Sequence, residues 1–122
     1  MCKVLLFAGT TEGREIAQHL KNTIVSLTVS VATGYGETLI DKASNINILT
    51  NRLGKEEMVQ LLNKENFHLV IDATHPYAVE VTQNIIKSCE ETSTKYLRVI
   101  RESEGIGVSD AIIYVNSVEE AC

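Results

Sequence analysis

The segment VLLFAGTTEGREIAQHL, residues 4–20, passes from a strand-like run to a helix-like run through a turn of small and hydroxyl-bearing residues. Its first residues are continuously apolar, which is typical of a strand buried on both faces of a parallel sheet. Ile16, Ala17 and Leu20 then recur at helical spacing and predict a helix over residues 11–22. A bare turn at the amino end of a helix leaves backbone N–H groups accessible, so this junction predicts an anion-binding loop.

Strand-like and helix-like runs alternate along the rest of the chain. This alternation predicts an α/β fold: a doubly wound, Rossmann-like parallel sheet of five or six strands with helices on both faces. The predicted strands cover residues 3–8, 24–32, 46–50, 69–73, 96–100 and 111–115. In such a sheet the carboxyl ends of the strands share one edge, and ligands bind there.

Two further long helices are predicted, over residues 54–65 and 77–91, with a short helical turn over 37–43. Pro76 suits the first turn of the later helix. The side chains expected to face the sheet are Met58, Leu61 and Leu62 in one helix and Ala78, Val81, Ile85 and Cys89 in the other.

Length and charge restrict the possible functions. The 122 residues suit one domain, and a formal charge of −5 argues against charge-driven binding to nucleic acid or to an anionic membrane. No apolar run reaches the roughly 20 residues that span a bilayer, and the first residues lack a cleavage site, so we expect a cytoplasmic protein. Cys2, Cys89 and Cys122 are widely spaced, which favours reduced structural thiols and no metal site.

The last residues predict the start of another helix. Ser117 is followed three residues later by Glu120, the pattern of a capping box. Because this helix barely begins before residue 122, we expect the sequence to be part of a longer protein.

The turn after the first strand has the sequence GTTEGR. Gly9 permits a sharp turn, and Gly13 permits the helix to lie close to a strand or a ligand. Thr10 and Thr11 can cap the helix or donate hydrogen bonds to a phosphate. The alternative is an ordinary tight turn in which Glu12 interacts with the helix dipole. The turn matches neither the full G-x-G-x-x-G fingerprint nor a P-loop.

A glycine-rich loop follows the second predicted strand, where NAD-selective proteins usually carry an acidic residue. Thr33, Gly34, Tyr35 and Gly36 offer hydroxyls, accessible N–H groups and an aromatic face. They suit an adenosine ribose or its 2′-phosphate, or they simply turn the chain.

DATHPYA, residues 72–78, follows the fourth predicted strand. Thr74 and His75 are expected at the ligand-binding edge, where His75 can donate a hydrogen bond or carry a charge, and Tyr77 adds a phenolic donor. Asp72 is expected to brace the turn or to tune His75.

Arg98 and Arg101 flank the end of the fifth predicted strand. A guanidinium at this position can bind a carboxylate or phosphate, or it can pair with Glu102 or Glu104.

The GTTEGR turn, the ATGYG loop, VIDATHPYAVEVTQNI and YLRVIR, in this order, resemble the precorrin-6A reductase family of cobalamin biosynthesis, including its cobalt-precorrin variant. The resemblance covers nearly the whole chain. Family members have two Rossmann-like halves, which implies that residues 1–122 form the N-terminal nucleotide-binding domain and that the C-terminal half is absent from this sequence.

The resemblance implies a reductase that uses NADPH or NADH to deliver hydride to a double bond of a tetrapyrrole substrate. Residues 9–14 and 33–36, with Thr74 and Pro76, would then bind the cofactor. His75 and Tyr77 would be catalytic, and Arg98 and Arg101 would bind substrate carboxylates. The chain alone is expected to bind cofactor without reducing the macrocycle. The alternative is a non-catalytic nucleotide-sensing module, and the sequence does not determine the oligomeric state.

Overall fold

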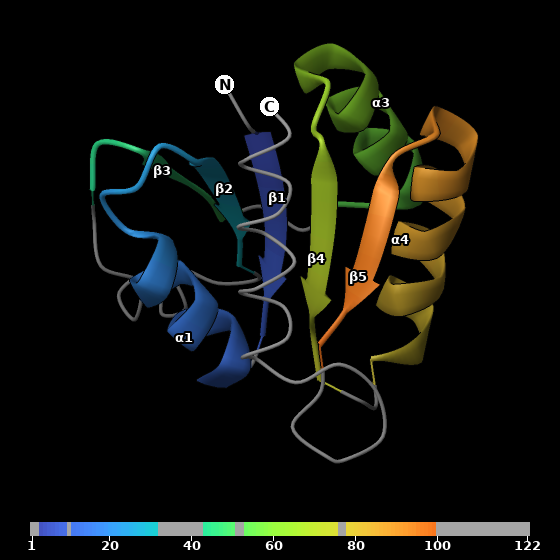
Figure 1. Ribbon diagram of the computed structural model, residues 1–122. Helices are drawn as coiled ribbons and strands as arrows, with labels where there is room; N and C mark the ends of the chain where they lie inside the picture. The colour runs from blue at the N-terminus through green and yellow to red at the C-terminus, as the bar shows by residue number, and fades with distance from the viewer. Residues whose placement is uncertain (1–2, 10, 32–42, 51–52, 76–77, 100–122) are drawn as a thin grey trace.

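The computed structural model describes residues 3–9, 11–31, 43–50, 53–75 and 78–99. Its centre is a sheet of five parallel strands in the order β3-β2-β1-β4-β5 (Figure 1). The strands are β1 (Lys3–Ala8), β2 (Ser26–Ser30), β3 (Ile46–Leu49), β4 (Leu69–Ala73) and β5 (Lys95–Arg98). This is the strand order of a Rossmann-like sheet, so the predicted fold class is confirmed.

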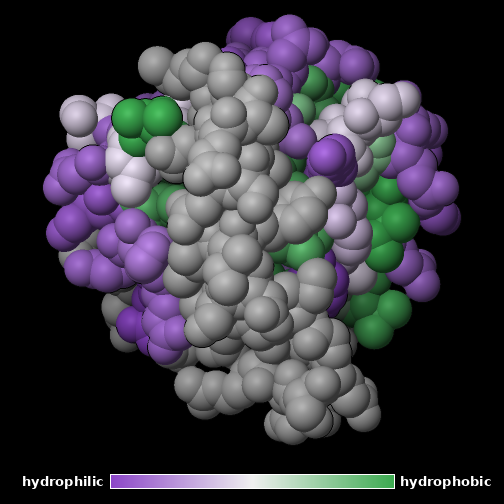
Figure 2. All heavy atoms as spheres, viewed as in Figure 1, coloured by the Kyte–Doolittle hydropathy of each residue, from purple (hydrophilic) through white to green (hydrophobic). Residues whose placement is uncertain are grey.

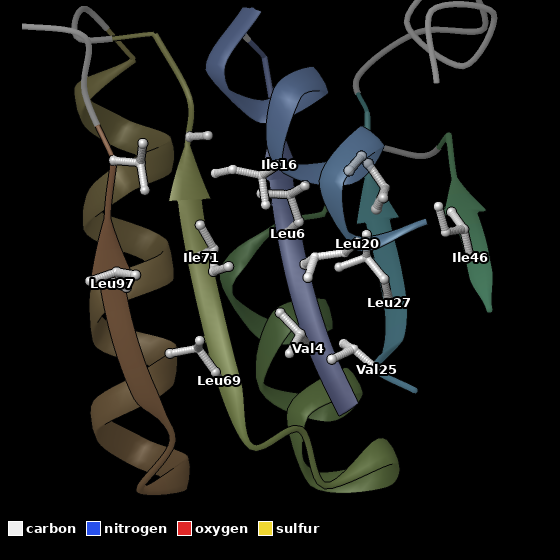
Figure 3. Close-up of a cluster of buried hydrophobic side chains, with 14 of the residues drawn as sticks. Val4, Leu6, Ile16, Leu20, Val25, Leu27, Ile46, Leu69, Ile71 and Leu97 are labelled. Atoms are coloured by element: carbon white, nitrogen blue, oxygen red, sulfur yellow. The ribbon is translucent and has the colours of Figure 1, made fainter. Parts of the chain in front are cut away.

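Helices cover both faces of the sheet. Helix α1 (Thr11–Leu20) lies on one face, and α3 (Lys55–Glu65) and α4 (Val79–Thr92) lie together on the other (Figures 1 and 3). Each of these helices joins two parallel strands, which is the usual connection in a parallel sheet. All carboxyl ends of the strands therefore lie at one edge of the sheet.

The period-two alternation of strand side chains divides the core into two layers. Val4 and Leu6 of β1 point toward α1, where they pack with Ile16 and Leu20 (Figure 3). Leu5 and Phe7 of β1 point the opposite way, toward α3 and α4. They form a second cluster with Met58, Leu62, Val70, Ile85 and Cys89. Because β1 is buried on both faces from Val4 to Phe7, this part of its sequence is apolar without interruption.

The helix and strand ends differ slightly from the predictions for physical reasons. Helix α1 ends at Leu20, two residues early, because Asn22 has a positive φ of 63° and Thr23 Oγ1 donates to the Leu20 carbonyl at 2.8 Å. Strand β2 begins at Ser26, and Ile24 before it is 70% exposed. The predicted strand at 111–115, most of the helical turn at 37–43 and the capping box at 117–120 lie outside the described residues.

One predicted core position is wrong. Val81 is 39% exposed, and in this turn of α4 Thr82 faces the sheet instead; its hydroxyl donates to the carboxylate of Asp72 at 3.0 Å. In the view of Figure 2, the described surface is mainly hydrophilic, with a few separate apolar groups. Among the described helices, none is long and apolar enough to cross a bilayer.

Candidate functional site

The site lies where β1 and β4 end side by side at the carboxyl edge of the sheet. Strand order reverses here, because the chain runs from β1 toward β3 on one side and from β4 toward β5 on the other. The Gly9 N–H donates to the Ala73 carbonyl at 3.3 Å and ties the two strand ends together. In doubly wound sheets the ligand-binding crevice lies at such a reversal, so we expect the crevice of this protein at the ends of β1 and β4.

Gly9 forms one side of this crevice. A Cβ on Gly9 would lie 3.6 Å from Thr74 Cα and 3.9 Å from the His75 nitrogen, at ordinary contact distance. Gly9 is exposed, and α1 begins only two residues later. The bare backbone of Gly9 therefore lies between the amino end of a helix and the loop that follows β4.

Gly13 allows α1 to pack directly on the strand ends. A Cβ at this position would lie 2.9 Å from both Cα and Cβ of Ala8 and 3.4 Å from Cβ of Ala73. Side chains do not approach backbone this closely, so only glycine fits without a shift of the helix. The expectation that Gly13 lets the helix lie close to a strand is confirmed.

A buried carboxylate organises the other side of the crevice. Asp72, near the end of β4, has no exposed surface, and its side chain points toward α4 and β5. Its Oδ1 accepts hydrogen bonds from Thr74 N, Thr74 Oγ1 and Arg98 Nη1 at 3.0, 2.7 and 2.9 Å. Its Oδ2 accepts from Thr82 Oγ1 at 3.0 Å and from the Tyr96 hydroxyl at 2.8 Å. Both oxygens of the buried carboxylate therefore have hydrogen-bond donors, as a buried polar group requires.

Arg98 connects Asp72 to the loop after β4. Its Nη1 donates to the Thr74 carbonyl and to Thr74 Oγ1, both at 3.0 Å, and it is also 3.3 Å from the Asp72 carbonyl. The Arg98 side chain is 23% exposed, whereas that of Asp72 is fully buried. The prediction that Arg98 binds substrate carboxylates stays a prediction; the pairing seen in the structure is with Asp72.

This charged cluster affects two neighbouring acids. Burial, the hydrogen bond to Asp72 and its negative charge raise the pKa of the Tyr96 hydroxyl well above its usual range. Burial, with a smaller effect of the Asp72 charge, raises the pKa of the Cys89 thiol to about 11. Both groups are therefore neutral at physiological pH, and Tyr96 serves Asp72 as a hydrogen-bond donor.

The structure brings together four of the predicted site residues: Gly9 lies beside Thr74 and His75, and Arg98 binds Thr74. His75 is exposed at the crevice, and its carbonyl accepts the Ala78 N–H at 2.9 Å. Arg14 is exposed on α1. For Thr11 and Glu12 only the helical backbone is described. Outside the described residues lie Thr10, Thr33, Gly34, Tyr35, Gly36, Pro76, Tyr77 and Arg101.

Sequence reasoning missed Thr82 and Tyr96. The strand pattern contained a signal for them, because Asp72 interrupts the buried run LVIDA and a buried carboxylate requires donors. One of the two roles predicted for Asp72 was to brace the turn after β4, and the hydrogen bond from Thr74 N confirms this role. Within the described ranges, no group of three or more His, Cys, Asp or Glu side chains is arranged to hold a metal ion.

The parallel sheet, its reversal of strand order between β1 and β4 and the glycine turn before α1 define a Rossmann-like α/β protein. The fold alone is shared with a Rossmann-fold NAD(P)-binding family protein from Shigella flexneri at 13% identity and a TM-score of 0.68, over 98% of this chain and 62% of that one. The model of the family described as Precorrin-6x reductase CbiJ/CobK matches residues 3–122. The chain belongs to this family.

Individual relatives agree with this assignment. The chain is 34% identical over 119 residues to cobalt-precorrin-6A reductase of Methanocaldococcus jannaschii, covering 97% of this chain and 47% of that protein. It is 32% identical over 125 residues to precorrin-6A reductase of Mycobacterium tuberculosis, covering 99% and 48%. A solved structure, CobK precorrin-6A reductase, matches at 27% identity with a TM-score of 0.71, over 84% of this chain and 40% of that one. The chain thus spans about half the length of the curated relatives it matches.

Proposed function

We propose that this chain is the nucleotide-binding part of a precorrin-6A or cobalt-precorrin-6A reductase and that it binds NADPH or NADH. The observation that carries the proposal is the reversal of strand order between β1 and β4, where Gly9 lies beside Thr74 and His75 near the start of α1. Family membership supplies the reaction, because the relatives are reductases of these corrin precursors by name.

The residues around the crevice suit a dinucleotide. Gly9 has no side chain to keep a pyrophosphate away, and the amino end of α1 favours negative charge. Gly13 keeps that helix end close to the strands, since a larger residue would meet Ala8. We propose that residues 9–14 contact the phosphates, that 33–36 contact the adenosine, and that Thr74 and Pro76 lie near the nicotinamide.

A bound nicotinamide cofactor would supply hydride, and the protein would supply position and a proton. In this proposal the exposed His75, with Tyr77, orients the macrocycle or donates the accompanying proton. Arg101 is proposed to bind substrate carboxylates. These roles are tested in a longer chain that contains this sequence and reduces the macrocycle. Unchanged turnover and unchanged substrate affinity in both His75→Ala and Tyr77→Phe would exclude the roles proposed for His75 and Tyr77.

Nucleotide binding is tested on the 122 residues directly. We expect calorimetric titration with NADPH and NADH to show saturable binding of at least one of them, and cobalt-precorrin-6A added to the mixture to remain unreduced. Absence of binding by both nucleotides would overturn the proposal. The 122 residues could bind nucleotide while substitutions within them leave tetrapyrrole reduction by the longer chain unchanged. That result would favour the nucleotide-sensing module instead.

A further inference from the structure

Asp72 and Arg98 form an ion pair with each other, whereas charged residues that bind a ligand leave their charge available to it. The Asp72 carboxylate is fully buried, and Arg98 Nη1 lies 2.9 Å from its Oδ1. The negative charge of Asp72 therefore compensates most of the positive charge of the guanidinium at short range. An arginine in this state is poorly suited to be the main attraction for another carboxylate.

The pair holds the peptide groups on both sides of Thr74. Asp72 Oδ1 accepts the Thr74 N–H at 3.0 Å, and Arg98 Nη1 donates to the Thr74 carbonyl at 3.0 Å. The threonine hydroxyl is bound as well, by Asp72 at 2.7 Å. With its N–H, carbonyl and hydroxyl all held, Thr74 has little freedom, and the His75 peptide that follows is placed by it.

The segment held in this way faces the glycine turn. A Cβ on Gly9 would contact Thr74 Cα and the His75 nitrogen at 3.6 and 3.9 Å, so the two loops lie side by side. A dinucleotide spanning the strand-order reversal places one half on each side of it. With phosphates at α1 and adenosine toward β2, the nicotinamide half lies on the β4 side.

We propose that Asp72 and Arg98 are positioning residues for the nicotinamide half of the cofactor. Arg98 acts through Asp72 and Thr74: it holds the backbone of Thr74 and His75 at the distance from Gly9 that the bound nicotinamide mononucleotide requires. This inference rests on the proposed function, and it gives Arg98 a role other than the predicted binding of substrate carboxylates.

The test compares whole dinucleotides with their adenosine halves. NADPH, NADH, 2′,5′-ADP and ADP are titrated into the wild-type chain, into Arg98→Gln and into Lys3→Gln. Lys3→Gln is the matched control, because it also removes a cation 2.9 Å from a carboxylate, that of Glu65, at the opposite edge of the sheet. If Arg98→Gln fails to fold with Asp72 left unpaired, the double variant Asp72→Asn/Arg98→Gln, which removes both charges, replaces it.

We expect Arg98→Gln to weaken binding of the preferred dinucleotide by about tenfold, which corresponds to about 1.4 kcal/mol, and to change binding of its adenosine half by less than about twofold. Lys3→Gln should change neither. Equal loss of both ligands would mean a purely structural role and would overturn the inference, as would unchanged dinucleotide affinity. If the wild type binds none of the four ligands, the proposed function itself fails and the inference fails with it.

Discussion

A Cβ on Gly13 would lie 2.9 Å from the Cβ of Ala8, so helix α1 and strand β1 approach each other as closely as a glycine permits. This contact sets where the amino end of α1 lies relative to the strand ends. A Cβ on Gly9 would have no such close contact. The two glycines of the turn therefore have different roles: Gly13 allows the helix to pack on the strand, and Gly9 leaves space beside the loop after β4.

Replacing Gly13 by alanine should destabilise the fold. The added methyl group would clash with Cα and Cβ of Ala8 on strand β1, so α1 must shift. Such overpacking costs about 1–3 kcal/mol of unfolding free energy. Urea unfolding followed by circular dichroism measures this loss. A Gly13→Ala protein as stable as wild type would show that the helix moves freely on the sheet.

Replacing Gly9 by alanine should affect binding and leave stability nearly unchanged. The methyl group has room, since its nearest atoms are at 3.6 and 3.9 Å, and the φ of Gly9 lies outside the left-handed region. The change in unfolding free energy should stay within about 0.5 kcal/mol. The same methyl group occupies space proposed for the pyrophosphate, so NADPH or NADH affinity should fall about tenfold in the calorimetric titration. Unchanged affinity would place the phosphates elsewhere.

Removing the hydroxyl of Thr82 should reveal how much the buried carboxylate depends on α4. Thr82→Val keeps the shape of the side chain but deletes the donor 3.0 Å from Asp72 Oδ2, which should cost about 1–3 kcal/mol of unfolding free energy. Val81→Thr is the control, because Val81 is 39% exposed and the change should stay within about 0.5 kcal/mol. Equal effects of the two variants would contradict the assignment of Thr82 to the Asp72 cluster.

Stability should fall at alkaline pH. The pKa of the Cys89 thiol is raised from 9.0 to about 11, and the pKa of Tyr96 is raised as well, so the unfolded chain loses these protons at lower pH than the folded chain. The folded state is thus favoured fully below about pH 9, and this contribution is lost as pH rises toward 11. Urea unfolding at pH 8 and pH 10.5 measures the loss, and Cys89→Ala should reduce the difference between the two values. An identical difference in the variant would mean that Cys89 does not contribute.

Local sequence patterns predicted most of the fold. The continuous apolar run of β1, the helical spacing in α1 and the alternation that follows were enough to predict a parallel, doubly wound sheet, and β1 and β4 begin and end where expected. The prediction failed at Val81 because helical spacing treats every apolar residue as a core candidate. The strand beneath α4 presents a carboxylate at this point, so a hydroxyl packs there in preference to a methyl group.

The features of the candidate site also fall into two groups, those that the sequence predicted and those that only the structure revealed. The sequence by itself determined the glycine turn before α1, the polar segment after β4 and the family, because these depend on residues adjacent in the chain. Only the tertiary structure decided the distant partners of Asp72, since Thr82, Tyr96 and Arg98 are 10, 24 and 26 positions away and come from α4 and β5. A buried carboxylate takes its donors from whichever elements pack against it, and the packing of strands and helices brings together residues that no local pattern connects.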